Sequence, residues 1–257
     1  MPTPDAAGRP QRTPRPTVTL EVQAVEWLSP HMVRLVLGGP GFANFVDNDH
    51  TDKYVKLQFP EQDVTRTYTV RYVDRDAQQL AIDFVVHGDQ GVAGPWAAGA
   101  RPGDTISLKG PGGGYSPDPA ADWHLLVGDA SALPAIGAAL AALPPDARGV
   151  AHLLVEDDAE VLALSAPTGV QLHWAFHSPA GSAPSLLAEA ITDGPWLPGR
   201  VQVFAHGERE SMKAVRAVLK QRSIPREDLS LSGYWAFGRS EDRFQAEKRE
   251  PIGQIPQ

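Results

Sequence analysis

Apolar residues recur at every second position through the first half of the chain, from Thr17 to about Lys109. A period of two is the spacing of β-strands that bury one face. Gly, Pro and Asp separate the alternating segments, as turns between short strands require. The pattern therefore predicts six antiparallel strands in a barrel or a sandwich. The alternating sets are Val18, Leu20 and Val22; Val33, Leu35 and Leu37; Val55, Leu57 and Phe59; Tyr68, Val70 and Tyr72; Leu80, Ile82, Phe84 and Val86; and Ile106 and Leu108.

The spacing of the apolar residues changes after a glycine-rich run at 110–114. Residues 123–127 are continuously apolar, which is typical of a strand buried on both faces. A helical stripe follows, for which we predict Ser131 as N-cap, Pro134 in the first turn and Pro144-Pro145 as the stop. Further strands are expected near 150–155, 170–176, 201–205 and 229–234, and helices near 185–191, 210–222 and 240–250. Strands that alternate with helices predict a parallel sheet covered on both faces.

These two patterns of apolar residues predict two domains, an antiparallel β-barrel at 17–115 and a parallel-sheet α/β domain at 120–257. The glycine-rich run 110–114 is interpreted as the hinge between them. Residues 1–16 are rich in Pro and Arg and lack an apolar core. They predict a disordered leader and not a secretory signal.

Composition excludes several classes of chemistry. The 257 residues contain no cysteine, which excludes disulfides, thiolate nucleophiles and iron–sulfur clusters. A formal net charge of -8 argues against non-specific nucleic-acid binding. No long apolar run is present, so we expect no membrane insertion. The lack of cysteine is compatible with a reducing cytoplasm, and we expect a monomeric cytoplasmic protein.

Metal-binding and phosphate-loop signatures are missing. The eight histidines are scattered, and no H-E-x-x-H, G-x-S-x-G or G-x-x-x-x-G-K-[ST] motif occurs. No resident metal and no catalytic side chain are predicted. Any metal that the protein handles is expected to arrive already bound to a small molecule.

The strand Arg66-Thr67-Tyr68-Thr69-Val70-Arg71 is the strongest candidate for chemistry. It offers an aromatic ring to cover a flavin, hydroxyls to touch its edge and an arginine to meet its phosphates. Spacing alone favours a plainer interpretation, in which two arginines lie at the surface and the tyrosine fills the barrel. Both interpretations stay open at this point.

Three other stretches have open alternatives of the same kind. The loop 87–96 has glycines that let backbone N–H groups approach a diphosphate, or it is an ordinary barrel loop. The turn 128–131 follows a buried strand, where parallel sheets bind ligands, or it is a simple helix cap. The aromatic tail 232–242 could shield a planar cofactor or belong to the core.

Taken in order, these stretches resemble the siderophore-interacting proteins, a branch of the ferredoxin-reductase-like flavoproteins. The similarity covers essentially everything after the leader. The matching pieces are Tyr54-Val55-Lys56-Leu57, Arg66 to Arg71, Asp83 to Gly88, Trp96-Ala97, Arg101-Pro102-Gly103-Asp104, Gly110-Pro111, Tyr115, Gly128-Asp129, Ala132 to Ile136, Gly233-Tyr234-Trp235, Gly238 to Asp242 and Ala246 to Glu250.

The resemblance implies an FAD-binding Greek-key barrel followed by an NAD(P)H-binding α/β domain whose C-terminal helix covers the flavin. Arg66 would contact FAD phosphate, Tyr68 would stack on the isoalloxazine, and Thr69 would hydrogen-bond near its N5. The expected FAD and NAD(P)H contacts are Arg66, Thr67, Tyr68, Thr69, His87, Gly91, Val92, Ala93, Gly94, Trp96, Asp129, Ser131, Ala132, Tyr234 and Trp235. The expected substrate rim is Lys53, Lys56, Arg239, Lys248 and Arg249.

Departures from the family pattern affect the donor and substrate contacts. A phosphate-loop serine is replaced by Gly94, and a glutamate after Gly128-Asp129 is replaced by Ala130. A basic pair is replaced by Ala236-Phe237, and an aromatic by Pro251. An altered electron donor or substrate is compatible with these changes.

Members of the family are ferric-siderophore reductases, so NAD(P)H is expected to reduce FAD and FAD to reduce siderophore-bound Fe(III) to Fe(II). The acids Glu156-Asp157-Asp158 favour NADH, since an acid there can bind a ribose 2′-hydroxyl, or they form a solvated turn. Two other functions remain as alternatives. One is a general NAD(P)H:flavin reductase or an oxygenase reductase component; the other is a module that binds a siderophore or flavin without redox work.

Overall fold

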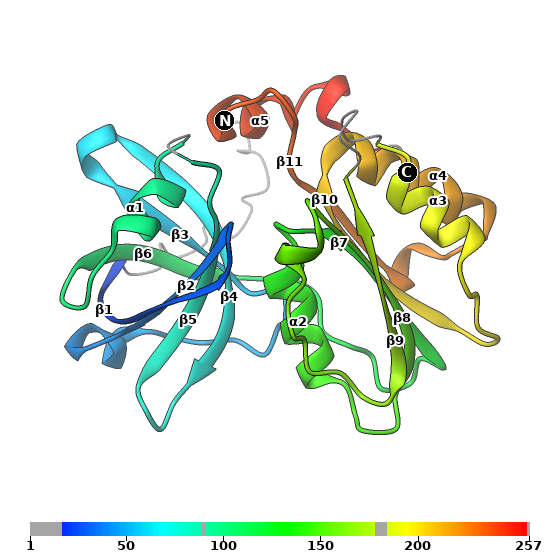
Figure 1. Cartoon of the computed structure of the whole chain (residues 1–257), viewed down its shortest axis with the longest axis horizontal. Coiled ribbons are helices and arrows are strands. Elements are labelled where there is room, and N and C mark those ends of the chain that lie inside the picture. The colour runs from blue at the N-terminus through cyan, green and yellow to red at the C-terminus, as the bar shows by residue number, and fades with distance from the viewer. Residues whose placement is uncertain (1–16, 89–90, 178–183, 256–257) are drawn as a thin grey trace, which may run out of the picture.

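The first half of the chain forms a closed six-stranded barrel. The structure, a computed structural model, describes residues 17–88, 91–177 and 184–255; the predicted leader lies outside them. The barrel strands are β1 (Thr17–Ser29), β2 (Met32–Gly38), β3 (Tyr54–Phe59), β4 (Val64–Asp74), β5 (Gln79–Val85) and β6 (Thr105–Gly112). They pair antiparallel in the closed order β1-β2-β5-β4-β3-β6, which confirms the predicted barrel (Figure 1).

Most of the alternating apolar residues fill the barrel as expected; Tyr72 is an exception, because a register shift follows Val70 and its ring is exposed. Leu35, Leu57 and Ile82 are fully buried, because every second side chain of each strand points inward. Helix α1 (Ala93–Gly99) lies at the barrel, where the Trp96 ring packs on Phe59 and Phe84 at centroid distances of 5.8 and 6.1 Å. Short 3-10 helices occur at Pro40–Asn44 and Pro60–Gln62.

The second half forms a five-stranded parallel sheet in the order β11-β10-β7-β8-β9. Every pair of neighbours is parallel, which confirms the predicted α/β class. The strands are β7 (Trp123–Asp129), β8 (Arg148–Val155), β9 (Gly169–Phe176), β10 (Val201–Glu208) and β11 (Leu229–Trp235). The helices are α2 (Leu133–Ala142), α3 (Leu186–Asp193), α4 (Arg209–Gln221) and α5 (Glu241–Glu247), with 3-10 turns at Asp158–Glu160, Arg226–Asp228 and Pro251–Gly253.

Helix α2 lies between the sheet and the barrel, whereas α3 and α4 cover the far face of the sheet (Figure 1). A Cβ added at Gly137 of α2 would lie 2.9 Å from Nε of Arg71 on β4, so the absence of a side chain lets the two domains approach. At a second contact, Glu160 accepts hydrogen bonds from Ser29 and His31 of the β1–β2 turn, at 2.5 and 2.7 Å.

Several predicted boundaries are wrong. Ser131 is not the N-cap of α2, because its hydroxyl donates to the Asp129 side chain and Ala132 occupies the cap position. The supposed hinge is partly strand, since β6 continues to Gly112, against which the Tyr54 ring lies. Helix α5 ends at Glu247, so Lys248 and Arg249 follow the helix instead of lying inside it.

Among the described segments, no helix combines the length and apolar character needed to cross a membrane.

Candidate functional site

The four residues Arg66 to Thr69 stand on β4, where the barrel faces the parallel-sheet domain. The Tyr68 ring packs on Phe84 at a centroid distance of 4.4 Å, and burial raises the pKa of its hydroxyl. Strand alternation places Thr67 and Thr69 on the opposite side from Tyr68. The strand thus presents an aromatic ring, a guanidinium and two hydroxyls within four residues.

The first turn of α5 lies on this strand. Arg66 donates through Nη1 and Nη2 to the two carboxylate oxygens of Asp242, at 3.0 and 3.2 Å. The backbone N–H of Thr67 donates to Glu241 at 3.1 Å. Figure 1 shows α5 at the top of the view, between the barrel and the sheet. These acidic partners of Arg66 were not predicted, because acids in a first helical turn also suit the helix dipole.

Two predicted rim lysines lie beside this turn, close enough for the charge of one to affect the other. Lys56 of β3 donates to the Thr67 hydroxyl at 2.8 Å. Lys248 stacks over the Phe244 ring, with Nζ 4.7 Å from its centroid. Burial lowers the pKa of Lys248, and the charge of Lys56 lowers it further. Burial also raises the pKa of Glu241, against the opposing charges of Arg66 and Lys56. The structure therefore brings lysines from both domains to the predicted flavin strand.

Asp129 at the end of β7 ties together three strands of the sheet. Its Oδ1 accepts the backbone N–H and the hydroxyl of Ser131, at 2.9 and 2.5 Å. Its Oδ2 accepts the backbone N–H of Glu208 at the end of β10 at 2.7 Å and Nε1–H of Trp235 on β11 at 2.9 Å. Three predicted residues (Asp129, Ser131 and Trp235) are thus one hydrogen-bonded group at the carboxyl ends of the strands.

Tyr234 connects this group to the barrel. Its hydroxyl hydrogen-bonds the side chain of Thr69, and burial raises its pKa. On its other side, the ring meets His206 edge-on at 4.8 Å. His206, which was not among the predicted site residues, stacks on Phe204 at 4.0 Å, and burial lowers its pKa to about 3. A neutral imidazole therefore packs edge-on against the ring of Tyr234.

The loop before α1 provides mainly backbone at the surface. His87 and Gly91 are exposed, and Gly91 has a φ of 79°, a conformation that favours glycine. Asp89 and Gln90 lie outside the described residues. Ala93 and Gly94 are buried in α1 next to Val92, and a Cβ at Gly94 would lie 3.1 Å from the Val85 carbonyl oxygen. This close approach is a packing reason for glycine, instead of the family's serine, at position 94.

Other predicted residues serve the protein's own packing. Ala132 is fully buried beneath the β7–α2 turn. Lys53 is paired with Asp47 at 2.8 Å, and Arg239 with Glu247 at 2.8 Å. Arg249 is exposed after α5. A ligand role for these four residues remains a prediction.

Glu247 anchors the end of α5 on the sheet domain. Its buried carboxylate pairs with Arg209 at 2.7 Å, Arg239 at 2.8 Å and Arg243 at 2.9 Å. The hydrogen bond from Arg209, followed by those from Arg243 and Arg239, lowers the pKa of Glu247 to about 2. Phe244 is buried beside it, near Gly233.

We expect the ion pairs of Glu247 to stop stabilising the folded protein in acid. A carboxylate whose pKa is lower in the folded state stabilises that state above its ordinary pKa near 4.5, and the contribution disappears as the pH falls from there toward 2. Unfolding midpoints measured at successive pH values should therefore drop more steeply for the natural protein than for Glu247→Gln. Parallel curves for the two proteins would contradict the expectation.

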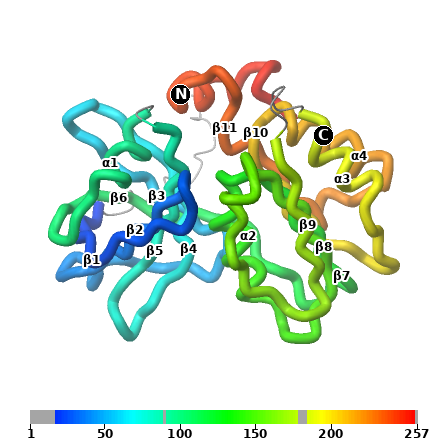
Figure 2. Tube along the Cα trace, in the orientation of Figure 1, coloured from blue at the N-terminus to red at the C-terminus, as the bar shows by residue number. Residues whose placement is uncertain are grey.

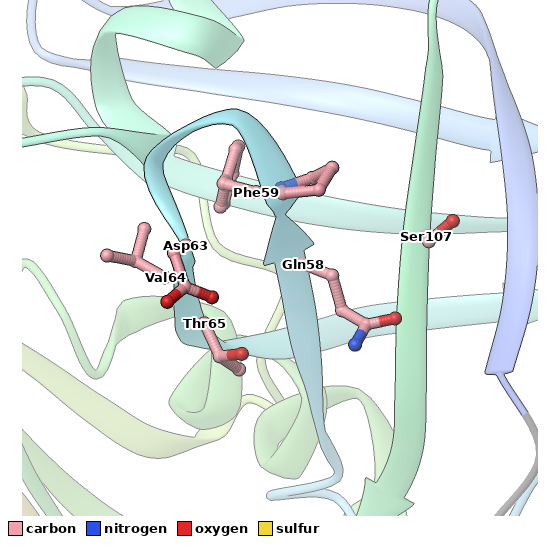
Figure 3. A pocket seen from close by; sticks show the side chains of 7 residues that line it. Gln58, Phe59, Asp63, Val64, Thr65 and Ser107 are labelled. Atoms are coloured by element: carbon pink, nitrogen blue, oxygen red, sulfur yellow. The ribbon is translucent and has the colours of Figure 1, made fainter.

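An open hollow of about 380 Å³ lies elsewhere, at the β3–β4 turn (Figure 3). It is lined by Gln58, Phe59, Pro60, Asp63, Val64, Thr65 and Ser107. None of the predicted site residues lines it. Within the parts of the chain that the structure describes, no group of three or more His, Asp or Glu side chains could hold a metal ion.

The closed barrel and the five-stranded parallel sheet together form a two-domain, ferredoxin-reductase-like architecture. The family model of the siderophore-interacting FAD-binding domain matches residues 21–65 and 61–115, and that of the siderophore-interacting protein matches residues 121–238. The chain belongs to the siderophore-interacting protein family, as its residues suggested.

Individual relatives agree with this assignment. The uncharacterized protein Rv2895c of Mycobacterium tuberculosis is 45% identical over 92% of this chain and 96% of its own. The ferric vibriobactin reductase ViuB of Vibrio cholerae is 33% identical over 87% of this chain and 90% of its own. A crystal structure of a siderophore utilization protein from T. fusca superimposes with a TM-score of 0.80 at 38% identity, covering 89% of this chain and 95% of that one.

Proposed function

We propose that the protein is an FAD-dependent ferric-siderophore reductase. The observation that carries the proposal is the β4 segment Arg66 to Thr69, where Tyr68 packs on Phe84 and Thr69 hydrogen-bonds Tyr234 of the second domain. Membership of the family and the 33% identity to a ferric vibriobactin reductase support the same activity. NAD(P)H would be the electron donor and the siderophore-bound ferric ion the acceptor.

The donor set on β4 fits FAD. Arg66 and the Thr67 N–H already hold carboxylate oxygens of this chain, so the same groups suit the phosphate oxygens of a cofactor. Tyr68 would lie against the flavin ring, and Thr69 would hydrogen-bond its edge. When bound, FAD would accept two electrons from NAD(P)H and pass them singly to two ferric ions, which siderophores hold less tightly once reduced.

The second domain would bind NAD(P)H at the carboxyl ends of β7 and β10, where open parallel sheets hold ligands. The Asp129 group fixes the ends of these strands. Asp157, one of the acids after β8, accepts the Ala159 N–H at 2.9 Å and so caps a turn. The choice between NADH and NADPH would rest mainly on the exposed Glu156 and Asp158.

Lys56 and Lys248 would attract an anionic ferric siderophore to the flavin. Their positions on different domains leave two positive charges close together on a chain of net charge -8. A local positive patch raises the rate of encounter with an anion, an effect that salt screens.

We expect Lys56→Gln with Lys248→Gln to lower kcat/KM for anionic ferric chelates by roughly tenfold at low salt. The value for neutral chelates should change little, and added salt should reduce the difference between variant and natural protein. Lys213→Gln, at a distant Glu210 pair on α4, is the matched control. Equal losses for neutral and anionic chelates would contradict the role.

The activity is tested by mixing the protein anaerobically with FAD, NAD(P)H and a ferric siderophore in the presence of a ferrous trap. The proposal predicts coloured ferrous complex only when all components are present. Failure to take up FAD would refute it. Faster oxidation of NAD(P)H with excess free flavin, without ferrous iron, would identify a flavin reductase instead.

A further inference from the structure

The first turn of α5 occupies the polar groups of the predicted flavin strand. Asp242 accepts both terminal nitrogens of Arg66, and Glu241 accepts the Thr67 N–H while lying 3.7 Å from Nε of Arg66. The contact joins segments 176 residues apart. Arg66 is thereby largely enclosed, with 13% of its side chain exposed, whereas 65% of the Asp242 side chain faces solvent.

The rest of α5 is held by different contacts. Phe244 is buried, and Glu247 pairs with Arg209 of α4, so the end of the helix is anchored on the second domain. The hydrogen bonds given for α5 to the barrel come from its first turn, at Glu241 and Asp242. Figure 2 shows the C-terminal segment, in orange and red, between the barrel and the sheet domain. Loss of the Asp242 contact would therefore free the first turn without releasing the helix.

A carboxylate and a phosphate bind a guanidinium and a backbone N–H through the same kind of hydrogen bond. Both are anions whose paired oxygens accept charge-assisted hydrogen bonds, and arginine binds either of them in a bidentate manner. One set of donors serves one such partner fully at a time.

We propose that Glu241 and Asp242 are an internal anion that competes with the diphosphate of FAD for Arg66 and Thr67. The inference rests on the proposed function, because it concerns the same cofactor site. In the FAD-free protein, the acidic turn keeps Arg66 paired, which avoids an enclosed charge without a partner. FAD binding displaces the turn, so the carboxylates weaken FAD affinity and set the ease of cofactor exchange.

Removal of one carboxylate tests the competition directly. Asp242→Asn keeps the size of the side chain but loses its charge, and we expect FAD to bind roughly three- to fivefold more tightly, the effect of losing one exposed ion pair. Flavin fluorescence quenching measures the dissociation constant without any turnover. Asp118→Asn, which removes an equal charge from the exposed Arg200 pair, should leave it unchanged.

The same pair of variants in an Arg66→Gln background distinguishes direct competition from general charge. Asp242→Asn should then have no effect, because its partner is gone. Equal tightening in both backgrounds would overturn the proposal, as would unchanged or weaker FAD binding by Asp242→Asn alone. Failure of the natural protein to bind FAD is a different outcome, since it would refute the proposed function itself.

Discussion

Arg66→Gln is expected to weaken FAD binding by roughly 10- to 100-fold, because hydrogen bonds to charged groups contribute about 1.5–3 kcal/mol each and 1.4 kcal/mol is a factor of ten. Arg66 is enclosed on β4 and already holds an oxyanion partner, so its guanidinium is oriented before a phosphate arrives. Glutamine keeps a donor but loses the charge and the two parallel bonds. Titration of the FAD-free protein with FAD, followed by flavin fluorescence, measures the change.

Arg75→Gln provides the matched control for this prediction. Arg75 follows β4 on the same barrel and pairs with Asp47 at 3.2 Å, but 69% of its side chain is exposed. Its loss removes an equal charge at a site with no contact to the flavin strand, so FAD affinity should stay near the natural value. If Arg66→Gln and Arg75→Gln bound FAD equally well, Arg66 would not hold the phosphates.

The architecture could be predicted from the sequence because burial repeats with the period of each element. All seven residues of β7 are buried, as its continuous apolar run indicated, and β3 alternates between buried and more exposed positions. The errors lie where a side chain found a distant partner. Ser131 bonds Asp129 instead of capping α2, and Gly112 extends β6 because Tyr54 packs over it.

The site was less predictable, for the same reason. The residues on β4 form a local motif, and their grouping on one strand follows from the sequence. The partners of these residues do not, because Asp242 lies 176 positions further along the chain than Arg66 and Tyr234 belongs to the other domain. Local patterns therefore identified the groups that offer hydrogen bonds, and the structure was needed to identify their acidic partners.

Asp129→Ala is expected to lower the free energy of unfolding by about 3 kcal/mol, because three partly buried donors lose their acceptor and an unpaired donor costs about 1–3 kcal/mol when it is fully buried. The Asp129 side chain is the acceptor for the Glu208 N–H, the Trp235 indole N–H and the Ser131 hydroxyl. In a chain of this size, such a loss lowers the Tm by roughly 6–12 °C, which thermal unfolding followed by circular dichroism would detect. The barrel does not use these bonds, so FAD binding should persist while the use of NAD(P)H declines.

Two substitutions show whether the bridging bonds are responsible. Asp129→Asn preserves the side-chain volume and one acceptor oxygen, so its stability should lie between those of the natural protein and the alanine variant. Asp157→Ala removes a carboxylate that accepts a single exposed N–H, from Ala159, and should cost about 1 kcal/mol or less. Because Asp129 joins β7 to the ends of β10 and β11, its loss should also loosen Trp235, measured as a change in tryptophan fluorescence. An alanine variant as stable as Asp157→Ala would show that Asp129 does not hold these strand ends together.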